Sequence, residues 1–278
     1  MKQRISHNQI EHELKSAFSK IDQPAIVMHT DLFRIRFAER GVPIQQQLEN
    51  LLSMIKNAAA GRPLLFPTFN YDFCRNGVYD VNNDPCQVGT FNEFIRQQNS
   101  GERTHTPVFN FYIINNNGFS CEPALNPFAA NSTFAEMVKK RAEITFLGAT
   151  FAANTFIHHV EEVMNIGYRY IKKFTGIIRC QTEEKNIKFE FRVRPTHEGA
   201  VDYDWLRLEK DLEENAMLRK YPVAGGYLLS FSAHRLLEYW QEKLRTDELY
   251  LLTPSSRQKI LELYNEYGKP LCFEKVEL

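Results

Sequence analysis

The sequence predicts an α/β fold, layered α/β/α, with a central mixed sheet and a small antiparallel β insert. Short apolar runs alternate with segments of helical apolar spacing up to about residue 166, as strands and helices alternate around a sheet. Beyond that point an apolar–polar alternation of period two begins. No internal repeat divides the 278 residues. We therefore expect one domain over residues 1–278, with the β-rich insert at about 168–194.

The first half of the chain alternates predicted helices and strands. Residues 25–28 form an apolar run typical of a buried strand, and Ile44, Leu48 and Leu51 share one face of a helix that Pro43 opens. In chain order, we expect a helix at about 8–17, a strand at 25–28, a helix at 44–55, a strand at 64–66, a short helix around 93–96, a strand at 109–114, a helix at 132–141, a strand at 144–147 and a helix from 154.

The second half begins with the insert. Ile187, Phe189, Phe191 and Val193 alternate with charged residues, which indicates a half-exposed antiparallel strand. Amphipathic helices are then predicted at about 205–218, 233–244 and 256–267.

Composition excludes several classes of protein. Lys+Arg and Asp+Glu number 34 each, so the formal charge is zero, which argues against a nucleic-acid partner and against a collector of polycations. No apolar run approaches the roughly 20 residues of a membrane span, and the N-terminus lacks a signal-peptide core. Five cysteines without a CxxC pair indicate reduced thiols, and we expect a cytoplasmic protein without a membrane partner.

The segment that follows the strand at 144–147 carries the most chemistry. On a helix beginning near residue 154, His158 lies three residues before Glu161 and four before Glu162, so either carboxylate can neighbour the imidazole. A carboxylate fixes the tautomer of a histidine and raises its basicity, as a general base requires. Thr155 lies on the same turn. The pattern is also compatible with capping or packed histidines, and a zinc site of His158, His159 and Glu162 is disfavoured because adjacent histidines point apart.

This segment resembles a known family. Its residues, Asn-Thr-Phe-Ile-His-His-Val-Glu, are similar to the Asn-Thr-x-x-His-x-x-Glu motif of the aminoglycoside 3-N-acetyltransferases. Further elements resemble that family in the same order over about residues 25–226: His29-Thr30-Asp31-Leu32, Pro67-Thr68-Phe69, Asp84-Pro85 with Gly89, Glu93 and Arg96, Arg103-Thr104 with Pro107, and Tyr168-Arg169 with Lys172 and Phe174.

The resemblance implies that the chain is an N-acetyltransferase that moves the acetyl group of acetyl-CoA directly to a primary amine. It implies that His158 is the general base, that Glu161 orients it, and that Thr155 and Thr68 donate hydrogen bonds near the thioester carbonyl. No cysteine or metal takes part. The cofactor-binding residues would be Thr30, Asp31, Leu32, Arg103, Thr104 and Ser132. Asp31 and Ser132 are also plain N-cap residues.

The acceptor is the open question. Carboxylates that could hold a polycationic aminoglycoside occur at Asp72, Asp80, Asp84, Glu161, Glu162, Glu209, Glu213 and Glu214. The insert is instead basic, with Arg169, Lys172, Lys173, Arg179, Arg192 and Arg194, although Arg192 and Arg194 suit a solvated outer face. Our hypothesis is therefore an amino sugar or its nucleotide conjugate, such as a surface-polysaccharide precursor.

Three alternatives stay open: an antibiotic-modifying acetyltransferase, a relative that binds CoA or a sugar without catalysis, and a metal hydrolase. Thr106 and Asn110 depart from the residues usual in the family at these positions, as does Asp31. The sequence leaves the oligomeric state open, a homo-oligomer included.

Overall fold

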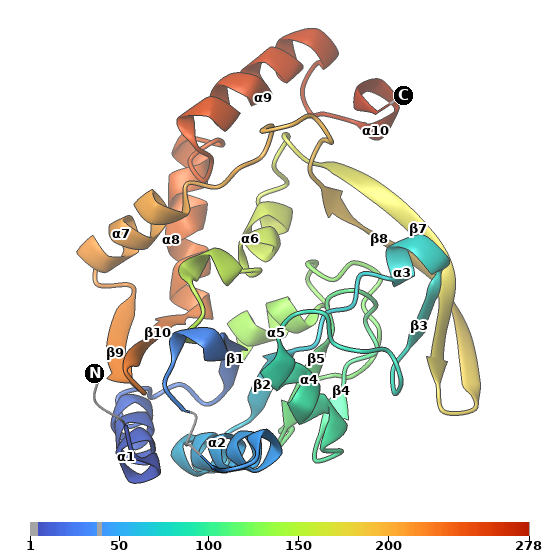
Figure 1. Cartoon of the computed structure of the whole chain (residues 1–278). Coiled ribbons are helices and arrows are strands. Elements are labelled where there is room, and N and C mark those ends of the chain that lie inside the picture. Colours follow the sequence, from blue (N-terminus) through green and yellow to red (C-terminus); the bar gives the residue numbers. More distant parts are fainter. Residues whose placement is uncertain (1–4, 38–40, 278) are drawn as a thin grey trace.

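A seven-stranded mixed sheet forms the centre of the computed structural model, which describes residues 5–37 and 41–277 (Figure 1). At its middle, β1 (Ile26–Thr30) runs parallel to β2 (Leu64–Pro67) and to β6 (Glu143–Leu147). Antiparallel strands flank these three, namely β5 (Phe111–Ile114), β4 (Glu102–Arg103), β10 (Gly226–Ser232) and β9 (Arg219–Val223). The predicted mixed sheet is confirmed.

Helices cover both faces of this sheet. The side chains of β1 alternate between two cores, because Ile26 and Met28 face one core whereas Val27 faces the other. The first core is covered by α1 (His7–Phe18), α2 (Ile44–Ala59) and α4 (Thr90–Gln97). The second is covered by α5 (Thr133–Lys139), α6 (Ile157–Val163), α7 (Trp205–Glu214) and α8 (Ala233–Thr246). The layered α/β/α arrangement is therefore also confirmed.

A second sheet contains the predicted insert. β7 (Tyr170–Cys180) and β8 (Glu183–Val193) form a long antiparallel hairpin, and Ile187, Phe189 and Phe191 of β8 are buried as the alternation indicates. The sequence did not predict its third strand, β3 (Val78–Asp80), which runs parallel to β7. Figure 1 shows the hairpin extending away from the central sheet, with β3 and α3 (Phe73–Asn76) beside it.

The C-terminal region packs at the base of the hairpin. A third core joins α9 (Pro254–Tyr267) and α10 (Phe273–Val276) to Tyr168 and Tyr170. Two short 3₁₀ helices, η1 (Leu32–Arg34) and η2 (Phe151–Ala153), follow β1 and β6. α7 ends four residues before its predicted end, at a turn in which Ala216 has a positive φ and Met217 N donates to Leu212 O, and residues 219–232 then form β9 and β10. The sequence missed these strands since β10 is buried on both faces and shows no alternation.

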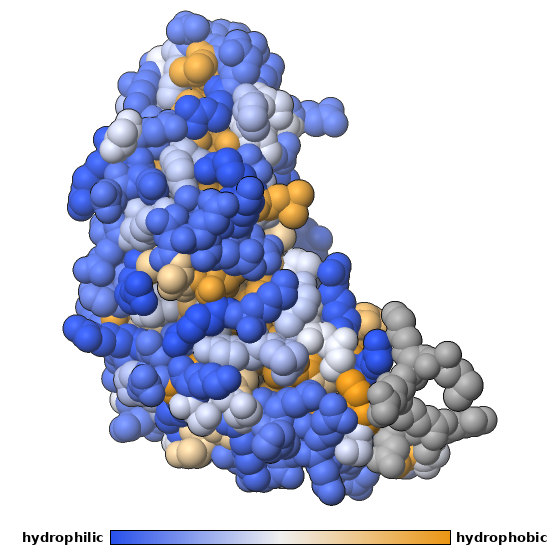
Figure 2. All heavy atoms as spheres, turned by 90° about the vertical axis from the view of Figure 1, so that its left-hand side faces the viewer, coloured by the Kyte–Doolittle hydropathy of each residue, from blue (hydrophilic) through white to orange (hydrophobic). Residues whose placement is uncertain are grey.

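Outer surfaces are mainly polar. Figure 2 shows one face of the molecule as largely hydrophilic, with apolar groups scattered between polar ones. Within the described residues, no helix is long and apolar enough to cross a membrane.

Candidate active site

The helix that carries His158 begins where the parallel strands of the central sheet end. β6 leaves the sheet through Gly148, where a Cβ atom would lie 2.4 Å from the backbone oxygen of Asp31, so the loop must pass close to the end of β1. After η2, the chain turns into α6 at Ile157. His158 therefore lies near the carboxyl ends of β1 and β6, the edge at which α/β sheets bind ligands.

His158 and Glu161 form a hydrogen-bonded pair. His158 Nδ1 lies 2.9 Å from Glu161 Oε2, whereas Glu162 pairs with Arg192 at 3.2 Å, which settles the choice between the two carboxylates. Because a carboxylate accepts the hydrogen bond, Nδ1 carries the proton and Nε2 retains its lone pair. Burial lowers the pKa of His158, as does Arg169, so the imidazole is neutral at pH 7.

Glu161 is itself fixed from several sides. Its side chain is 1 % exposed, and its Oε2 pairs with Arg169 Nε at 2.9 Å. Its Oε1 accepts hydrogen bonds from the hydroxyls of Tyr168 at 2.8 Å and Tyr203 at 2.7 Å. Burial favours the protonated form, but Arg169, His158 and Tyr203 outweigh it and lower the pKa of Glu161 to about 2. The carboxylate is therefore charged at every physiological pH.

Tyr203 is the residue of this group that the sequence did not predict. Its hydroxyl lies 3.3 Å from His158 Nδ1 and also accepts a hydrogen bond from Arg169. It comes from the segment before α7, 45 positions after His158. Tyr168 was predicted only as part of a family motif, and Arg169 both as part of that motif and as a basic residue of the insert. The structure brings all of them to the same carboxylate.

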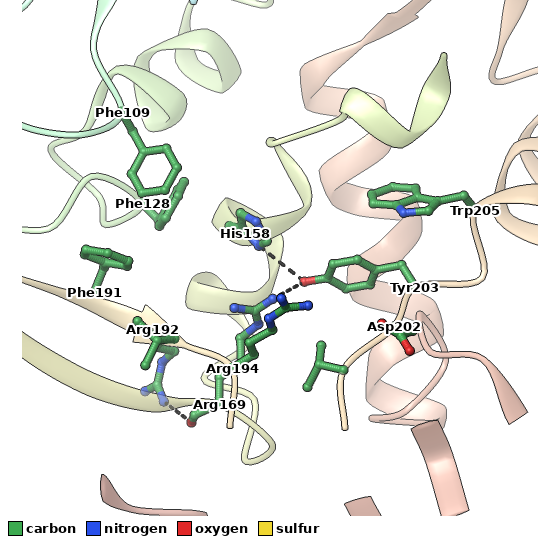
Figure 3. A pocket seen from close by; sticks show the side chains of 12 residues that line it. Phe109, Phe128, His158, Arg169, Phe191, Arg192, Arg194, Asp202, Tyr203 and Trp205 are labelled. Carbon is green, nitrogen blue, oxygen red and sulfur yellow. Dashed lines mark hydrogen bonds between the residues drawn. The ribbon is translucent and has the colours of Figure 1, made fainter. Parts of the chain in front are cut away.

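One cavity of about 490 Å³ opens on His158. We call it the His158 cavity, and Figure 3 shows it from close by. Hairpin residues form one side of it and the segment before α7 forms another. It is lined by Phe109, Phe128, His158, Arg169, Phe191, Arg192, Val193, Arg194, Val201, Asp202, Tyr203 and Trp205.

A second cavity of about 420 Å³ reaches Thr155, three residues before His158, and we call it the Thr155 cavity. The predicted residues Thr30 and Asp31 line it, together with residues that follow β2 and β6. Thr30 Oγ1 donates to Asn92 Oδ1 at 3.1 Å, and the Asp31 carboxylate caps η1, as an N-cap residue does. Burial lowers the pKa of His29, which also lines this cavity, to about 4.

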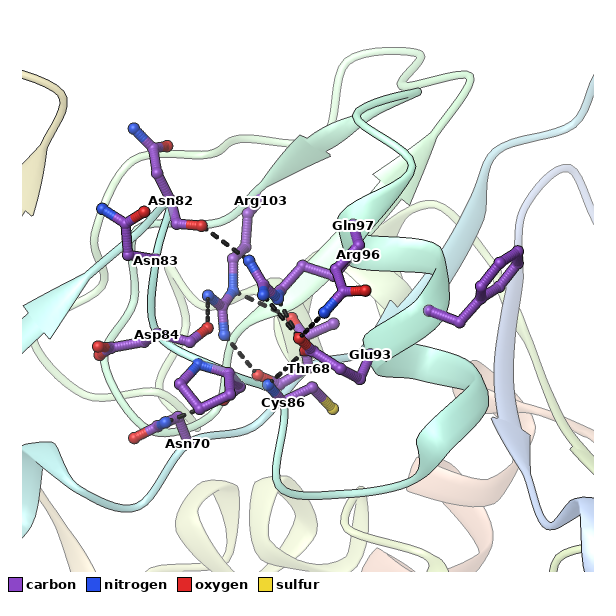
Figure 4. A network of polar contacts seen from close by, with 12 residues as sticks. Thr68, Asn70, Asn82, Asn83, Asp84, Cys86, Glu93, Arg96, Gln97 and Arg103 are labelled. Carbon is purple, nitrogen blue, oxygen red and sulfur yellow. Dashed lines mark hydrogen bonds and ion pairs between the residues drawn. The ribbon is translucent and has the colours of Figure 1, made fainter. Parts of the chain in front are cut away.

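Arg103 and Thr104, which we predicted as cofactor contacts, bond to the protein's own backbone. Arg103 is 6 % exposed and donates to the carbonyls of Thr68, Val81 and Asp84, at 2.8, 3.1 and 2.6 Å (Figure 4). The Thr104 hydroxyl is fully buried and accepts a hydrogen bond from the backbone of Phe111. Neither side chain lines the His158 or the Thr155 cavity. Both side chains hold the protein's own backbone, and Arg103 lines a different cavity, so their contact with a cofactor stays a prediction.

Thr68 belongs to the same buried network. Its hydroxyl donates to Asn110 Oδ1 at 2.7 Å, and Arg103 Nε donates to the same oxygen at 2.9 Å. Its proton is thus directed at Asn110 in this structure, and the predicted catalytic donation by Thr68 stays a prediction. Asn110, one of the departures from the family pattern, is the acceptor that holds this network together.

Leu32 and Ser132 line neither cavity. Leu32 packs, half-buried, against the core under α1 and α2. Ser132 is the N-cap of α5, accepting from Ala135 N at 3.2 Å and donating to Ala129 O at 2.7 Å. The capping interpretation is confirmed, and the buried cap has no hydroxyl proton left for a cofactor.

His159 supports the wall of the His158 cavity. Its Nδ1 donates to the carbonyl of Phe128 at 2.7 Å, on the side of the helix away from Glu161. Across residues 5–37 and 41–277, no group of three His, Cys, Asp or Glu side chains is placed to hold a metal ion.

Comparison with known proteins places this geometry in a family. The family model described as aminoglycoside 3-N-acetyltransferase matches residues 50–245. The chain belongs to this family. It is therefore an N-acetyltransferase by descent, and the match includes the pair His158 and Glu161. No curated protein sequence matches the chain.

Solved acetyltransferase structures share the fold of this family member. The aminoglycoside acetyltransferase AAC(3)-IVa, as an apoenzyme, aligns with a TM-score of 0.68 at 15 % identity, covering 93 % of this chain and 100 % of that one. AAC-IIIb, solved as a binary complex with CoASH, aligns at 0.70 and 15 %, covering 91 % and 99 %. AAC-VIa with bound sisomicin aligns at 0.66 and 16 %, covering 88 % and 99 %.

Proposed function

We propose that this family member transfers the acetyl group of acetyl-CoA to the primary amine of a small amino sugar, with His158 as general base. The observation that carries the proposal is the hydrogen bond between the neutral imidazole of His158 and the charged carboxylate of Glu161, at the point where two cavities approach one turn of the chain. The relative AAC-IIIb binds CoASH and AAC-VIa binds sisomicin, which supports a CoA donor and an amino-sugar acceptor.

The two cavities suit the two substrates. We assign the Thr155 cavity to acetyl-CoA, because it lies at the carboxyl ends of β1, β2 and β6, where nucleotide ligands bind in α/β sheets. We assign the His158 cavity to the amine, since that cavity exposes the imidazole. Thr155 then lies on the donor side and His158 on the acceptor side of the same short segment.

The chemistry follows from the protonation states. An amine attacks only through a free lone pair, and His158 Nε2 can accept the proton that the amine nitrogen loses as its bond to the acetyl carbon forms. The carbon–sulfur bond then breaks, and the same proton returns from Nε2 to the CoA sulfur. Glu161, already charged, stabilises the imidazolium between these two steps.

Thr155 is the remaining candidate donor to the thioester oxygen. Its hydroxyl makes one long contact, 3.5 Å to the carbonyl of Ala153, and it lines the cavity assigned to acetyl-CoA. A hydrogen-bond donor placed at a developing oxyanion lowers the activation barrier by about 3 kcal/mol. Of the two threonines predicted for this role, Thr155 is therefore the one that we expect to act as the donor.

Substitution of His158 tests the proposal. We expect His158→Ala to lower kcat for amine acetylation by roughly 10²–10⁴-fold, because the general base is lost, while acetyl-CoA binding by calorimetry is unchanged. His234→Gln, which changes a histidine on the outer helix α8, is the matched control and keeps full activity. Retained turnover in His158→Ala contradicts the assignment of the base.

The same assays separate the alternatives. A wild-type protein that binds acetyl-CoA but acetylates no amine is a binding relative without catalysis. Activity that a chelator abolishes indicates metal chemistry instead.

A further inference from the structure

The charges around the His158 cavity are nearly all compensated by partners within the protein. Arg169 pairs with the buried carboxylate of Glu161. Arg192, which we predicted on a solvated face, has a side chain only 13 % exposed, pairs with Glu162 at 3.2 Å and contacts the amide oxygen of Asn165. Neither arginine therefore offers a full positive charge to a ligand.

Arg194 differs from these two arginines. It is exposed, it lines the cavity, and within the described residues it forms no hydrogen bond or ion pair. Figure 3 shows it on the same side of the cavity as Arg169. Its guanidinium is the uncompensated positive charge among the cavity residues, and guanidinium groups bind phosphate through paired N–H donors.

Asp202 is the matching negative charge. It is exposed, and its carboxylate has no partner within the described part of the chain. It is also the single carboxylate that lines the cavity in the described residues, because Glu161 is buried behind His158. One carboxylate can neutralise one ammonium group, whereas an aminoglycoside brings several.

The remaining lining is uncharged and mostly aromatic. The ring centroids of Phe109, Phe128 and Phe191 lie 4.7 to 6.4 Å apart, and Tyr203 and Trp205 lie 5.0 Å apart. Such surfaces suit the apolar face of a sugar ring. They attract a cation more weakly than a carboxylate does, so they cannot replace a cluster of acids.

The cavity also continues beyond its mouth. A neighbouring cavity of about 670 Å³, formed by residues 194–202, shares Arg194, Val201 and Asp202 with it. A ligand with its amine at His158 could therefore place a second group past Arg194. Both unpaired charges lie where the two cavities join.

We propose that the acceptor is an amino sugar with one reacting amine and a phosphate or diphosphate group, and that Arg194 binds this anion. The proposal rests on the proposed function, because it names the acceptor of the same site. It departs from the polycationic acceptor, sisomicin, seen with a solved relative. Arg194 is then a specificity-determining residue that leaves the acetyl transfer itself to His158.

Matched acceptors test the proposal. Glucosamine, glucosamine 6-phosphate, UDP-glucosamine and sisomicin are compared by CoA release, and binding of the first three is measured by calorimetry in the presence of CoA. We expect at least one phosphate-bearing sugar to exceed glucosamine tenfold or more, in kcat/KM or in affinity. We expect Arg194→Gln to lower the values for the phosphate-bearing sugar tenfold or more and those for glucosamine much less, so that the preference is lost. Because Arg194 is exposed, the preference should also weaken as salt concentration rises.

Two further variants keep the test specific. Lys173→Gln removes an exposed positive charge from the same hairpin outside the cavity and should keep the preference. Arg194→Lys should restore part of it. The proposal is overturned if wild type shows no preference for phosphate, if Arg194→Gln keeps the preference, or if sisomicin is the best acceptor. A further outcome separates the two proposals. If no amine is acetylated, but acetyl-CoA still binds and sugar binding still depends on phosphate, the proposed function is contradicted and the anion site is not.

Discussion

The two cavities that approach α6 are built in different ways. The Thr155 cavity is formed by the turns that follow β1, β2 and β6, and apart from Asp31 its lining carries no charge at neutral pH. The His158 cavity is lined by residues of the hairpin and of 201–205, together with Phe109, Phe128 and His158, and most of these side chains are aromatic or charged. An acetyl donor that all members of a family share can be held by the turns of the common fold. The acceptor amine, in contrast, is selected by side chains that differ between proteins.

Several residues of the motifs that resemble the family lie on the first of these two sides, together with Asn110, which departs from the pattern. Arg103, Thr68 and Asn110 form a buried network behind Pro67, and Glu93 accepts from Cys86 N at 2.7 Å while it binds Arg96 (Figure 4). These contacts hold the segment that ends in Val88 and Gly89, which line the Thr155 cavity. The network supports the wall of a site without touching its ligand.

The largest effect should come from breaking this network. Arg103→Ala removes hydrogen bonds to three carbonyls, and we expect it to lower the free energy of unfolding by about 3 kcal/mol. The measurement is denaturant unfolding, with calorimetric binding of CoA. The affinity for CoA should fall by a larger factor than the KM for the amine rises, because the lost hydrogen bonds support the wall of the Thr155 cavity.

Thr68→Val is the milder partner of this variant if Arg103→Ala does not fold. It removes one hydroxyl from the same network and should cost about 1–2 kcal/mol. A larger loss of amine binding than of CoA binding, in either variant, contradicts the division between the two sides.

A smaller effect is expected on the other side. Tyr203→Phe removes the hydroxyl that donates to Glu161 and accepts from Arg169, so the carboxylate is less well oriented. We expect kcat to fall roughly tenfold, equivalent to one lost hydrogen bond, with CoA affinity unchanged. Tyr267→Phe, an exchange on α9 outside both cavities, is the control. Tyr203 is a positioning residue, so its loss should also move the acid limb of the pH profile, which a merely structural change would leave in place.

The smallest expected effect concerns the wild-type protein, namely the pH at which its activity falls on the acid side of the pH profile. Burial and Arg169 lower the pKa of His158 below its ordinary 6.5, and the base works only when neutral. At saturating amine and acetyl-CoA, turnover should therefore be present at pH 7 and fall only as the pH drops through a midpoint below 6.5, in a profile of kcat against pH. A midpoint above 6.5 indicates that His158 is not the base.

Local patterns explain what the sequence predicted correctly. The strands at the middle of the sheet are short apolar runs, and the spacing of His158 and Glu161 places them together on any helix. The caps formed by Asp31 and Ser132 depend on neighbours within three residues. That the chain forms one domain stays a prediction.

Contacts between distant segments explain what the sequence missed. Tyr203 reaches Glu161 across 42 positions, and Arg192 turns inward because Glu162 lies beneath it. Arg103 has the residue type of a phosphate ligand, and only the fold shows that backbone carbonyls surround it. A sequence motif does not distinguish residues that contact a ligand from residues that support the wall of the binding cavity.

Two Arg–Glu ion pairs fix the β7–β8 hairpin to helix α6. Glu161 and Glu162 are consecutive on α6, and they bind Arg169, next to the start of β7, and Arg192, near the end of β8. Both legs of the hairpin are thus clamped to one helical turn. Changes in length at the tip, near Gln181, leave this clamp intact. A slip of one residue between the legs would turn Arg192 to the opposite face and release Glu162. The strand register of an outlying hairpin therefore sets the alignment of the turn that carries the base.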